Sequence, residues 1–122
     1  MDDEDIAVLV VDDHPGVRLA IEALIARTPG LRLVGSVSSG AAAIEGVARL
    51  QPTVVVMDLG MPGMNGVEAT REIRKRKAAP VVVAFSRARA VARSASAGAA
   101  HAVPKDEDPH TLLETIRTAA RR

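Results

Sequence analysis

Apolar and polar positions follow two alternating patterns along the chain. Short, nearly continuous apolar runs rich in Val are separated by longer segments in which apolar residues recur every three or four positions. The first pattern is typical of strands buried on both faces, and the second of amphipathic helices. We therefore predict strands at Ile6–Val11, Leu31–Val37, Thr53–Met57, Pro80–Phe85 and the less apolar Ala100–Val103.

Local signals bound five helices between and after these strands. Pro15 suits a first helical turn, and Thr28-Pro29-Gly30 stops the helix that it opens. Short polar side chains, which cap helix N-termini, precede the second, third and fifth helices. The predicted helices run from Pro15 to the stop at Thr28, from Ser39 to Gln51, from Asn65 through Arg76, over Arg87–Ala97 and from Asp108 to Ala120.

The strict alternation of strands and helices predicts a parallel sheet covered by helices on both faces. The run Val54–Met57 supports this, because it has no polar position to face water. We expect a doubly wound α/β fold with a five-stranded parallel sheet. The 122 residues match the size of one compact domain, so we assign residues 1–122 to a single domain.

Several polar residues come directly after predicted strands. The carboxyl ends of parallel strands meet at one edge of a sheet, and doubly wound folds bind their ligands at that edge. The residues that this topology would gather are Asp12, Asp13, Asp58, Ser86 and Lys105.

Three crowded carboxylates indicate a cation site, because ionising all of them together is costly. Oxygen ligands without His or Cys suit Mg²⁺. A cation beside a reactive Asp favours phosphoryl transfer, with an oxygen of Asp58 as the nucleophile. Lys105 could then pair with the phosphoryl group, and the Ser86 hydroxyl could donate a hydrogen bond to it. The glycines after Asp58 would let backbone amides come close to the phosphoryl oxygens.

Taken alone, each of these residues also has a simpler explanation. Asp12 and Asp13 could be a helix N-cap pair, because Asp is favoured there. Asp58 could be a turn residue, Ser86 a loop serine and Lys105 a solvated lysine. Their joint placement at strand ends is what favours the phosphoryl-transfer interpretation.

Composition narrows the function classes. The net charge of +1 gives no bulk electrostatic reason for nucleic-acid binding, and without Cys there is neither a disulfide nor a Cys-based metal site. No apolar run approaches the ~20 residues of a membrane-spanning helix. The acidic start, MDDED, is unlike the basic start of a signal peptide. We expect a cytoplasmic protein that does not associate with a membrane.

Four short motifs occur in order along the chain: VVDDHP at 10–15, MDLGMPGMNG at 57–66, GAA at 98–100 and KD at 105–106. Together they resemble the receiver domain of bacterial two-component response regulators. The residues of these motifs are most similar to those of receivers that precede LuxR-type helix-turn-helix domains. The resemblance covers nearly the whole chain and implies a flavodoxin-like (βα)5 fold.

The resemblance also implies a role for the residues at the sheet edge. Asp58 would accept a phosphoryl group from a phosphohistidine on a sensor histidine kinase, the expected partner. Asp12, Asp13, Asp58 and the backbone carbonyl of Gly60 would hold Mg²⁺. Such a domain is not an enzyme for a separate substrate, although it assists its own phosphorylation and hydrolysis.

The switch region departs from the family pattern. Ser86 stands where the family has a switch Thr or Ser, and Lys105 matches its phosphate-pairing lysine. Ala102, however, occupies the position where family members usually carry Tyr or Phe, and Pro104 directly precedes the lysine. The segment between Ser86 and Lys105 is about one helical turn shorter than usual. Phe85 is the single aromatic residue of the chain.

Two other functions are weighed against the phosphoacceptor. A pseudo-receiver, an interaction module that is never phosphorylated, is favoured by Ala102 and by the short segment after Ser86. A phosphohydrolase of the haloacid dehalogenase type also places an Asp at a strand end, but needs a second Asp two residues on, where this chain has Gly60. Nucleotide-binding motifs of the P-loop and Rossmann kinds do not occur.

The sequence stops at Arg122, just after the last predicted helix. A stand-alone regulator is one interpretation. The similarity to receivers of LuxR-type regulators favours the other, in which the output, including any DNA binding, belongs to a domain outside this chain. The family resemblance also makes a homodimer through exposed helix faces an expectation.

Overall fold

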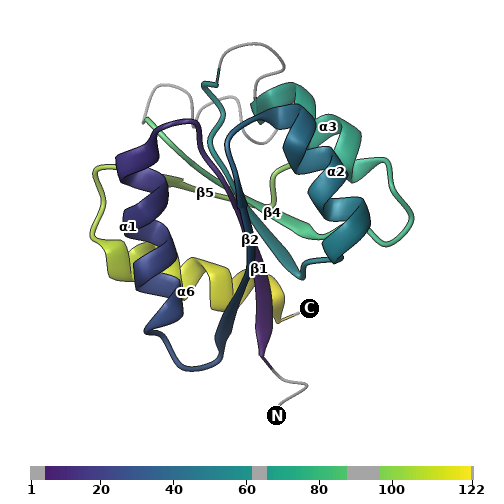
Figure 1. Cartoon of the computed structure of the whole chain (residues 1–122). Coiled ribbons are helices and arrows are strands. Elements are labelled where there is room, and N and C mark those ends of the chain that lie inside the picture. The colour runs from purple at the N-terminus through teal and green to yellow at the C-terminus, as the bar shows by residue number, and fades with distance from the viewer. Residues whose placement is uncertain (1–4, 62–65, 88–96, 122) are drawn as a thin grey trace.

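The computed structural model describes residues 5–61, 66–87 and 97–121. Within these ranges five parallel strands form one sheet in the order β2-β1-β3-β4-β5 (Figure 1). Each strand end lies within one residue of its predicted position, which confirms the predicted sheet. The strands are β1 (Ile6–Val11), β2 (Leu31–Val37), β3 (Val54–Met57), β4 (Val81–Ser86) and β5 (His101–Pro104).

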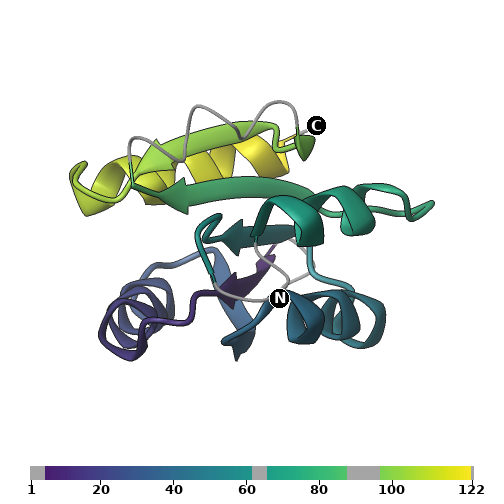
Figure 2. The ribbon, with the colours of Figure 1, turned by 90° about the horizontal axis from the view of Figure 1, so that it is seen from above.

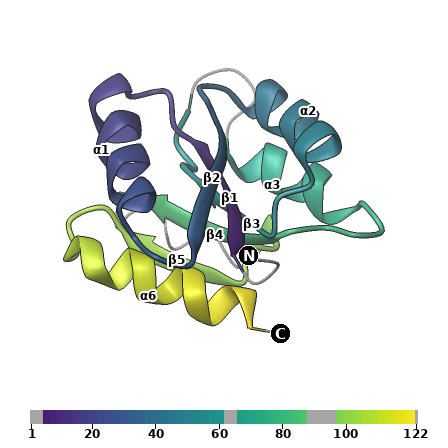
Figure 3. The same ribbon diagram turned by 60° about the horizontal axis from the view of Figure 1, so that its bottom comes forward.

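Helices cover both faces of the sheet, as expected for a doubly wound fold. On one face lie α1 (Pro15–Ala26) and α6 (Pro109–Ala120), and on the other α2 (Gly40–Leu50) and α3 (Gly66–Arg74) (Figure 1, Figure 3). The view from above shows the sheet between the two pairs (Figure 2). The helix predicted over Arg87–Ala97 falls almost entirely outside the described residues, as does the predicted cap Asn65.

The α3 helix ends at Arg74, two residues before the predicted end at Arg76. The backbone amides of Lys75 and Arg76 donate to carbonyls only three residues back, on Glu72 (3.3 Å) and Ile73 (3.1 Å). Such three-residue bonds tighten and close a final helical turn. The exposed cations of this segment therefore lie at a helix C-terminus, where the helix dipole favours positive charge.

Alternate residues of the central strands contribute their side chains to two separate hydrophobic cores, one on each face of the sheet. Val8 and Val10 of β1 pack toward α1 and α6, whereas Leu9 and Val11 pack toward α2 and α3. All four residues of β3 are buried. Burial on both faces explains why these strands are continuous apolar runs rather than alternating ones. No helix in the described ranges has the length and hydropathy of a membrane span.

Two predicted helix caps are confirmed. The hydroxyl oxygen of Ser39 accepts a hydrogen bond from the amide of Ala42 (3.1 Å), and its backbone is extended, as a cap residue requires. The Asp108 carboxylate accepts from the amide of His110 (2.9 Å) at the start of α6. This backbone hydrogen bond lowers the pKa of the Asp108 carboxyl.

Replacing Ser39 by alanine is expected to lower the free energy of unfolding by about 1 kcal/mol, because the Ala42 amide loses its acceptor. Urea unfolding measures the change. The matched control is Ser38→Ala, since Ser38 is the exposed neighbour and makes no cap. Equal stability of the two variants would contradict a capping role for Ser39.

Candidate functional site

The predicted site residues begin at the carboxyl ends of adjoining strands. In the parallel register Val11 lies opposite Met57, and Met57 opposite Ala84. Asp12 and Asp58 therefore directly follow neighbouring strands and lie side by side. The Asp58 amide donates to the Val11 carbonyl (3.0 Å). The two buried strands hold both acids on a fixed backbone.

Asp58 is only 7% exposed, and its carboxylate is held at both oxygens. Its Oδ1 accepts hydrogen bonds from the Ser86 hydroxyl (2.9 Å) and from the Gly60 amide (3.1 Å). Its Oδ2 lies 3.4 Å from the Lys105 Nζ. These three contacts fix the direction of a carboxylate that could act as a nucleophile.

Lys105 joins two of the acids. Its Nζ lies 2.8 Å from Asp12 Oδ2, in addition to its contact with Asp58. The Lys105 backbone amide donates to the Ser86 carbonyl (2.8 Å), which anchors the residue after β5 to the end of β4. Lys105 and Ser86, which are far from Asp12 and Asp58 in the sequence, thus lie against them as predicted.

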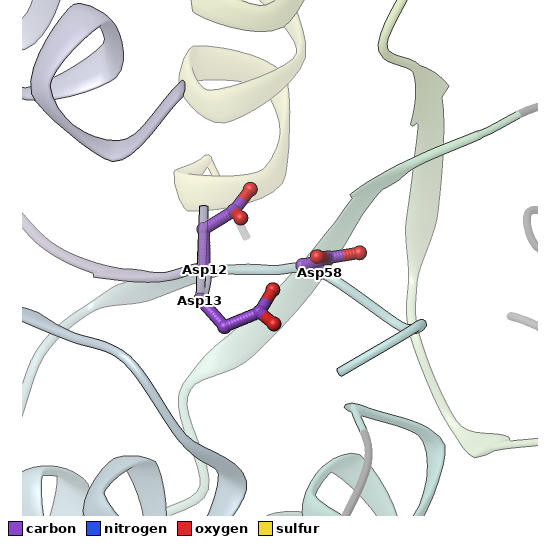
Figure 4. Close-up of side chains that lie close together, drawn as sticks. All are labelled: Asp12, Asp13 and Asp58. Atoms are coloured by element: carbon purple, nitrogen blue, oxygen red, sulfur yellow. The ribbon is translucent and has the colours of Figure 1, made fainter. Parts of the chain in front are cut away.

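Three carboxylates form the acidic cluster, which we define as Asp12, Asp13 and Asp58 (Figure 4). One oxygen from each lies within 4.8 Å of the other two. Asp12 is nearly fully buried, and its Oδ2 has Lys105 as a charged neighbour but no hydrogen-bond donor in suitable geometry among the described residues. A buried carboxylate oxygen with unused acceptor capacity, beside two further carboxylates, fits a hard divalent cation.

Neither acid at the end of β1 caps the following helix. The N-cap of α1 is His14, whose side chain makes no capping hydrogen bond. Asp12 Oδ1 instead accepts from the His14 amide (2.9 Å), within the turn that precedes the helix. The simpler explanation of Asp12 and Asp13 as a helix N-cap pair is therefore wrong.

A cavity of about 410 Å³ opens beside the acidic cluster. It is large enough for a phosphoryl group with its surrounding water, and it carries both charge signs. A cavity of about 530 Å³ lies at the opposite end of the sheet, beside Gln51 and Pro80, but it has no carboxylate in its lining. The cavity beside the cluster is lined by Asp13, His14, Val17, Asp58, Gly60, Ser86, Arg87 and Lys105.

The departure at Ala102 is visible in the fold. Ala102 lies in β5 opposite Ala84 and packs against the core on the α2 and α3 side. Phe85 packs against the other core, on the α1 and α6 side, and is half-buried. The one aromatic side chain is therefore on the face opposite to Ala102.

Sequence reasoning missed three residues that shape the site. Arg18 donates to the Asp12 carbonyl, Arg87 lines the cavity, and Gly66 lies directly against the Asp58 backbone. An Arg on a helix and a Gly after a loop carry no local signal of such contacts. The contacts of Arg18 and Gly66 follow only from the packing of α1 and α3 on the end of the sheet, and the place of Arg87 in the cavity lining follows from its position directly after β4.

This fold and site define a class of protein. The family model for the response regulator receiver domain matches residues 8–117. The chain therefore belongs to the response-regulator receiver family, the phosphoacceptor domains of two-component signal transduction. The match favours this class over the phosphohydrolase that the sequence left as an alternative.

Individual relatives support the assignment. The chain is 34% identical over 120 residues to the nitrate/nitrite response regulator protein NarL of Escherichia coli, covering 96% of this chain and 56% of NarL. It is 43% identical over 109 residues to protein-glutamate methylesterase/protein-glutamine glutaminase 4 of Geobacter metallireducens, covering 85% of this chain but 31% of that protein. The chain thus spans about half or less of the curated relatives that it matches.

A solved structure shows the same fold. The crystal structure of a LuxR-family two-component response regulator from Aurantimonas superimposes with a TM-score of 0.87 at 34% identity, over 95% of this chain and 85% of that one. The resemblance to receivers of LuxR-type regulators is therefore confirmed.

Proposed function

We propose that Asp58 is the phosphoacceptor of this receiver domain and that the donor is a phosphohistidine on a sensor histidine kinase. An oxygen of Asp58 bonds to phosphorus, the phosphorus–nitrogen bond breaks, and its electron pair returns to the histidine ring. The observation that carries the proposal is the environment of this carboxylate. It lies at the end of a buried strand, beside a cavity, held by Ser86, Gly60 and Lys105.

Asp12, Asp13, Asp58 and the backbone carbonyl of Gly60 would hold Mg²⁺. The all-oxygen donor set and the unused acceptor capacity of Asp12 Oδ2 support this assignment. When bound, the cation offsets the negative charge that develops on the transferring phosphoryl oxygens.

Ser86 and Lys105 would stabilise the phosphorylated form of the domain. Once Asp58 carries a phosphoryl group, the Ser86 hydroxyl can donate to a phosphoryl oxygen instead of to Asp58 Oδ1. Lys105 already lies between Asp12 and Asp58 and can pair with the added charge. The domain acts on no separate substrate, although these groups assist its own phosphorylation and dephosphorylation.

We propose the output of this domain, meaning the process that it regulates, by analogy with its relatives. NarL is named as a response regulator, and the Aurantimonas protein as a member of the LuxR family, so transcription regulation through a DNA-binding domain outside this chain is the proposed output. We propose further that residues 1–122 form one receiver domain in the cytoplasm. A homodimer through helix faces is also proposed, and Leu19 of α1, 62% exposed, offers an apolar contact for it.

Incubation with acetyl phosphate and Mg²⁺ tests the phosphoacceptor. Intact-mass spectrometry is expected to show the addition of one phosphoryl group to the wild type and none to Asp58→Asn. Asp106→Asn, an exposed acid next to Lys105, is the matched control and should be phosphorylated like the wild type. Beryllium fluoride with Mg²⁺, which mimics the phosphoryl group, should shift the amide resonances of the residues around Asp58. A wild type that gains no phosphoryl group would instead support the pseudo-receiver.

Charge crowding in the acidic cluster predicts how the metal-free protein behaves. Asp13→Asn is expected to raise the free energy of unfolding without metal, by less than about 1 kcal/mol because Asp13 is exposed. Mg²⁺ should raise the melting temperature of the wild type, and of this variant less. Thermal unfolding measures both, with the exposed Glu45→Gln on α2 as the control. Unchanged or lower metal-free stability of Asp13→Asn would refute the crowding argument.

A further inference from the structure

The turn after β1 is held by hydrogen bonds at three polar atoms of Asp12, which are its amide, its Oδ1 and its carbonyl oxygen. Its amide donates to the Val37 carbonyl (3.1 Å), and its Oδ1 accepts from the His14 amide (2.9 Å). Its Oδ2 faces Lys105. Its carbonyl oxygen accepts a hydrogen bond from Nη1 of Arg18 (2.8 Å), the contact with no role in the function proposed above.

Arg18 is itself held in place by a neighbour on its own helix, and that neighbour is bonded to β2. Its Nε lies 3.8 Å from Oε2 of Glu22, one turn further along α1. The same Glu22 oxygen accepts a hydrogen bond from the Ser36 hydroxyl of β2 (2.5 Å). About a quarter of the Arg18 and Glu22 side chains is exposed, so both are partly shielded from water. A chain of polar contacts therefore runs from β2 through α1 to the end of β1.

The peptide plane explains why the Asp12 carbonyl matters. The carbonyl of Asp12 and the amide of Asp13 belong to one rigid planar unit. The side chain of Asp13 is exposed and has no hydrogen bond or ion pair with another described residue. The Asp13 side chain can turn about its own bonds, but its point of attachment is set by the backbone, and that backbone is fixed in part by Arg18.

We propose that Arg18 is a positioning residue, which orients the Asp12 and Asp13 carboxylates for a divalent cation and is held in that place by Glu22 and Ser36. The inference rests on the proposed Mg²⁺ site. Groups that orient metal ligands typically change metal affinity by 10- to 100-fold when they are removed. An ordinary ion pair on a helix surface, four residues apart, contributes little to stability and nothing to a metal site.

The test compares two charge-balanced double variants. Arg18→Met with Glu22→Gln removes the contacts of Arg18 with the Asp12 carbonyl and with the Glu22 carboxylate but leaves the net charge unchanged. Arg49→Met with Glu45→Gln makes the same exchanges, at the same four-residue spacing, on the exposed face of α2. The dissociation constant of Mg²⁺ alone is measured from the amide resonances of residues 12–14, at a temperature well below the melting temperature of every variant.

The first double variant is expected to bind Mg²⁺ about tenfold more weakly than the wild type, and the α2 double variant equally well. Ser36→Ala should also weaken Mg²⁺ binding, but by less than the first double variant does. If that double variant does not fold, Ser36→Ala tests the positioning role in its place. Arg18→Lys, which keeps one donor for the Asp12 carbonyl, should recover part of the affinity.

A purely structural role of Arg18 would lower the melting temperature and leave the dissociation constant unchanged. That result, with the wild type binding Mg²⁺ normally, would overturn the positioning role alone. A wild type without measurable Mg²⁺ binding would instead overturn the metal site and this inference together.

Discussion

Replacing Gly66 by alanine is expected to lower the free energy of unfolding by about 3 kcal/mol, near the upper end of the usual cost of overpacking. An added Cβ would lie 1.9 Å from the carbonyl oxygen of Asp58 and 2.5 Å from the Cα of Leu59. Both neighbours are backbone atoms of buried residues, so neither can rotate away. The first turn of α3 must therefore move off the end of β3 and displace the Asp58 backbone.

Gly16→Ala is the matched control for this substitution. Gly16 also lies in the first turn of a helix, α1, and an added Cβ would meet no atom within 4 Å. Alanine there should be neutral or slightly stabilising, by up to about 1 kcal/mol. Urea unfolding of both variants measures the difference. If Gly66→Ala costs no more than Gly16→Ala, the close approach of the two backbones is not a constraint on this protein.

Lys105→Met is expected to cost about 3 kcal/mol of stability without metal, because it leaves the buried Asp12 without its cation. A second substitution, Asp12→Asn, should restore part of this loss, since the charge that needed a partner is gone. Mg²⁺ should also restore part of it, because a divalent cation would compensate the same carboxylates.

Thermal and urea unfolding with and without Mg²⁺ measure these effects. The control is Lys77→Met, an exposed lysine after α3, which is expected to change stability by less than about 0.5 kcal/mol. If Lys105→Met is as stable as this control, the ion pair between Lys105 and Asp12 contributes nothing to the fold.

The position of Lys105 refines the electrostatic argument made from the sequence. Three acids at one edge suggest a strongly repulsive cluster that requires a cation. The structure places a lysine amine 2.8 Å from Asp12 and 3.4 Å from Asp58, so part of this repulsion is already offset within the chain. Asp13 is the exposed member without such a partner among the described residues, which is why its substitution is expected to have a small effect.

Much of the fold and the site was determined by the sequence alone. Apolar runs such as Val54–Met57 fixed the strands, because only a strand buried on both faces needs no polar position. Alternation with helices made the sheet parallel, and a parallel sheet brings all its carboxyl ends to one edge. The approach of Asp12, Asp58, Ser86 and Lys105 followed without knowledge of any distance.

The tertiary structure alone decided which atoms meet. Strand order depends on where each crossover places the next strand, and local periodicity contains no such information. The order β2-β1-β3-β4-β5 makes β1 the neighbour of both β2 and β3, so Ser36 and Asp12 can be linked through α1. The contact between Arg18 and the Asp12 carbonyl, and the approach of Gly66 to Asp58, join residues through packing rather than through any pattern in the sequence.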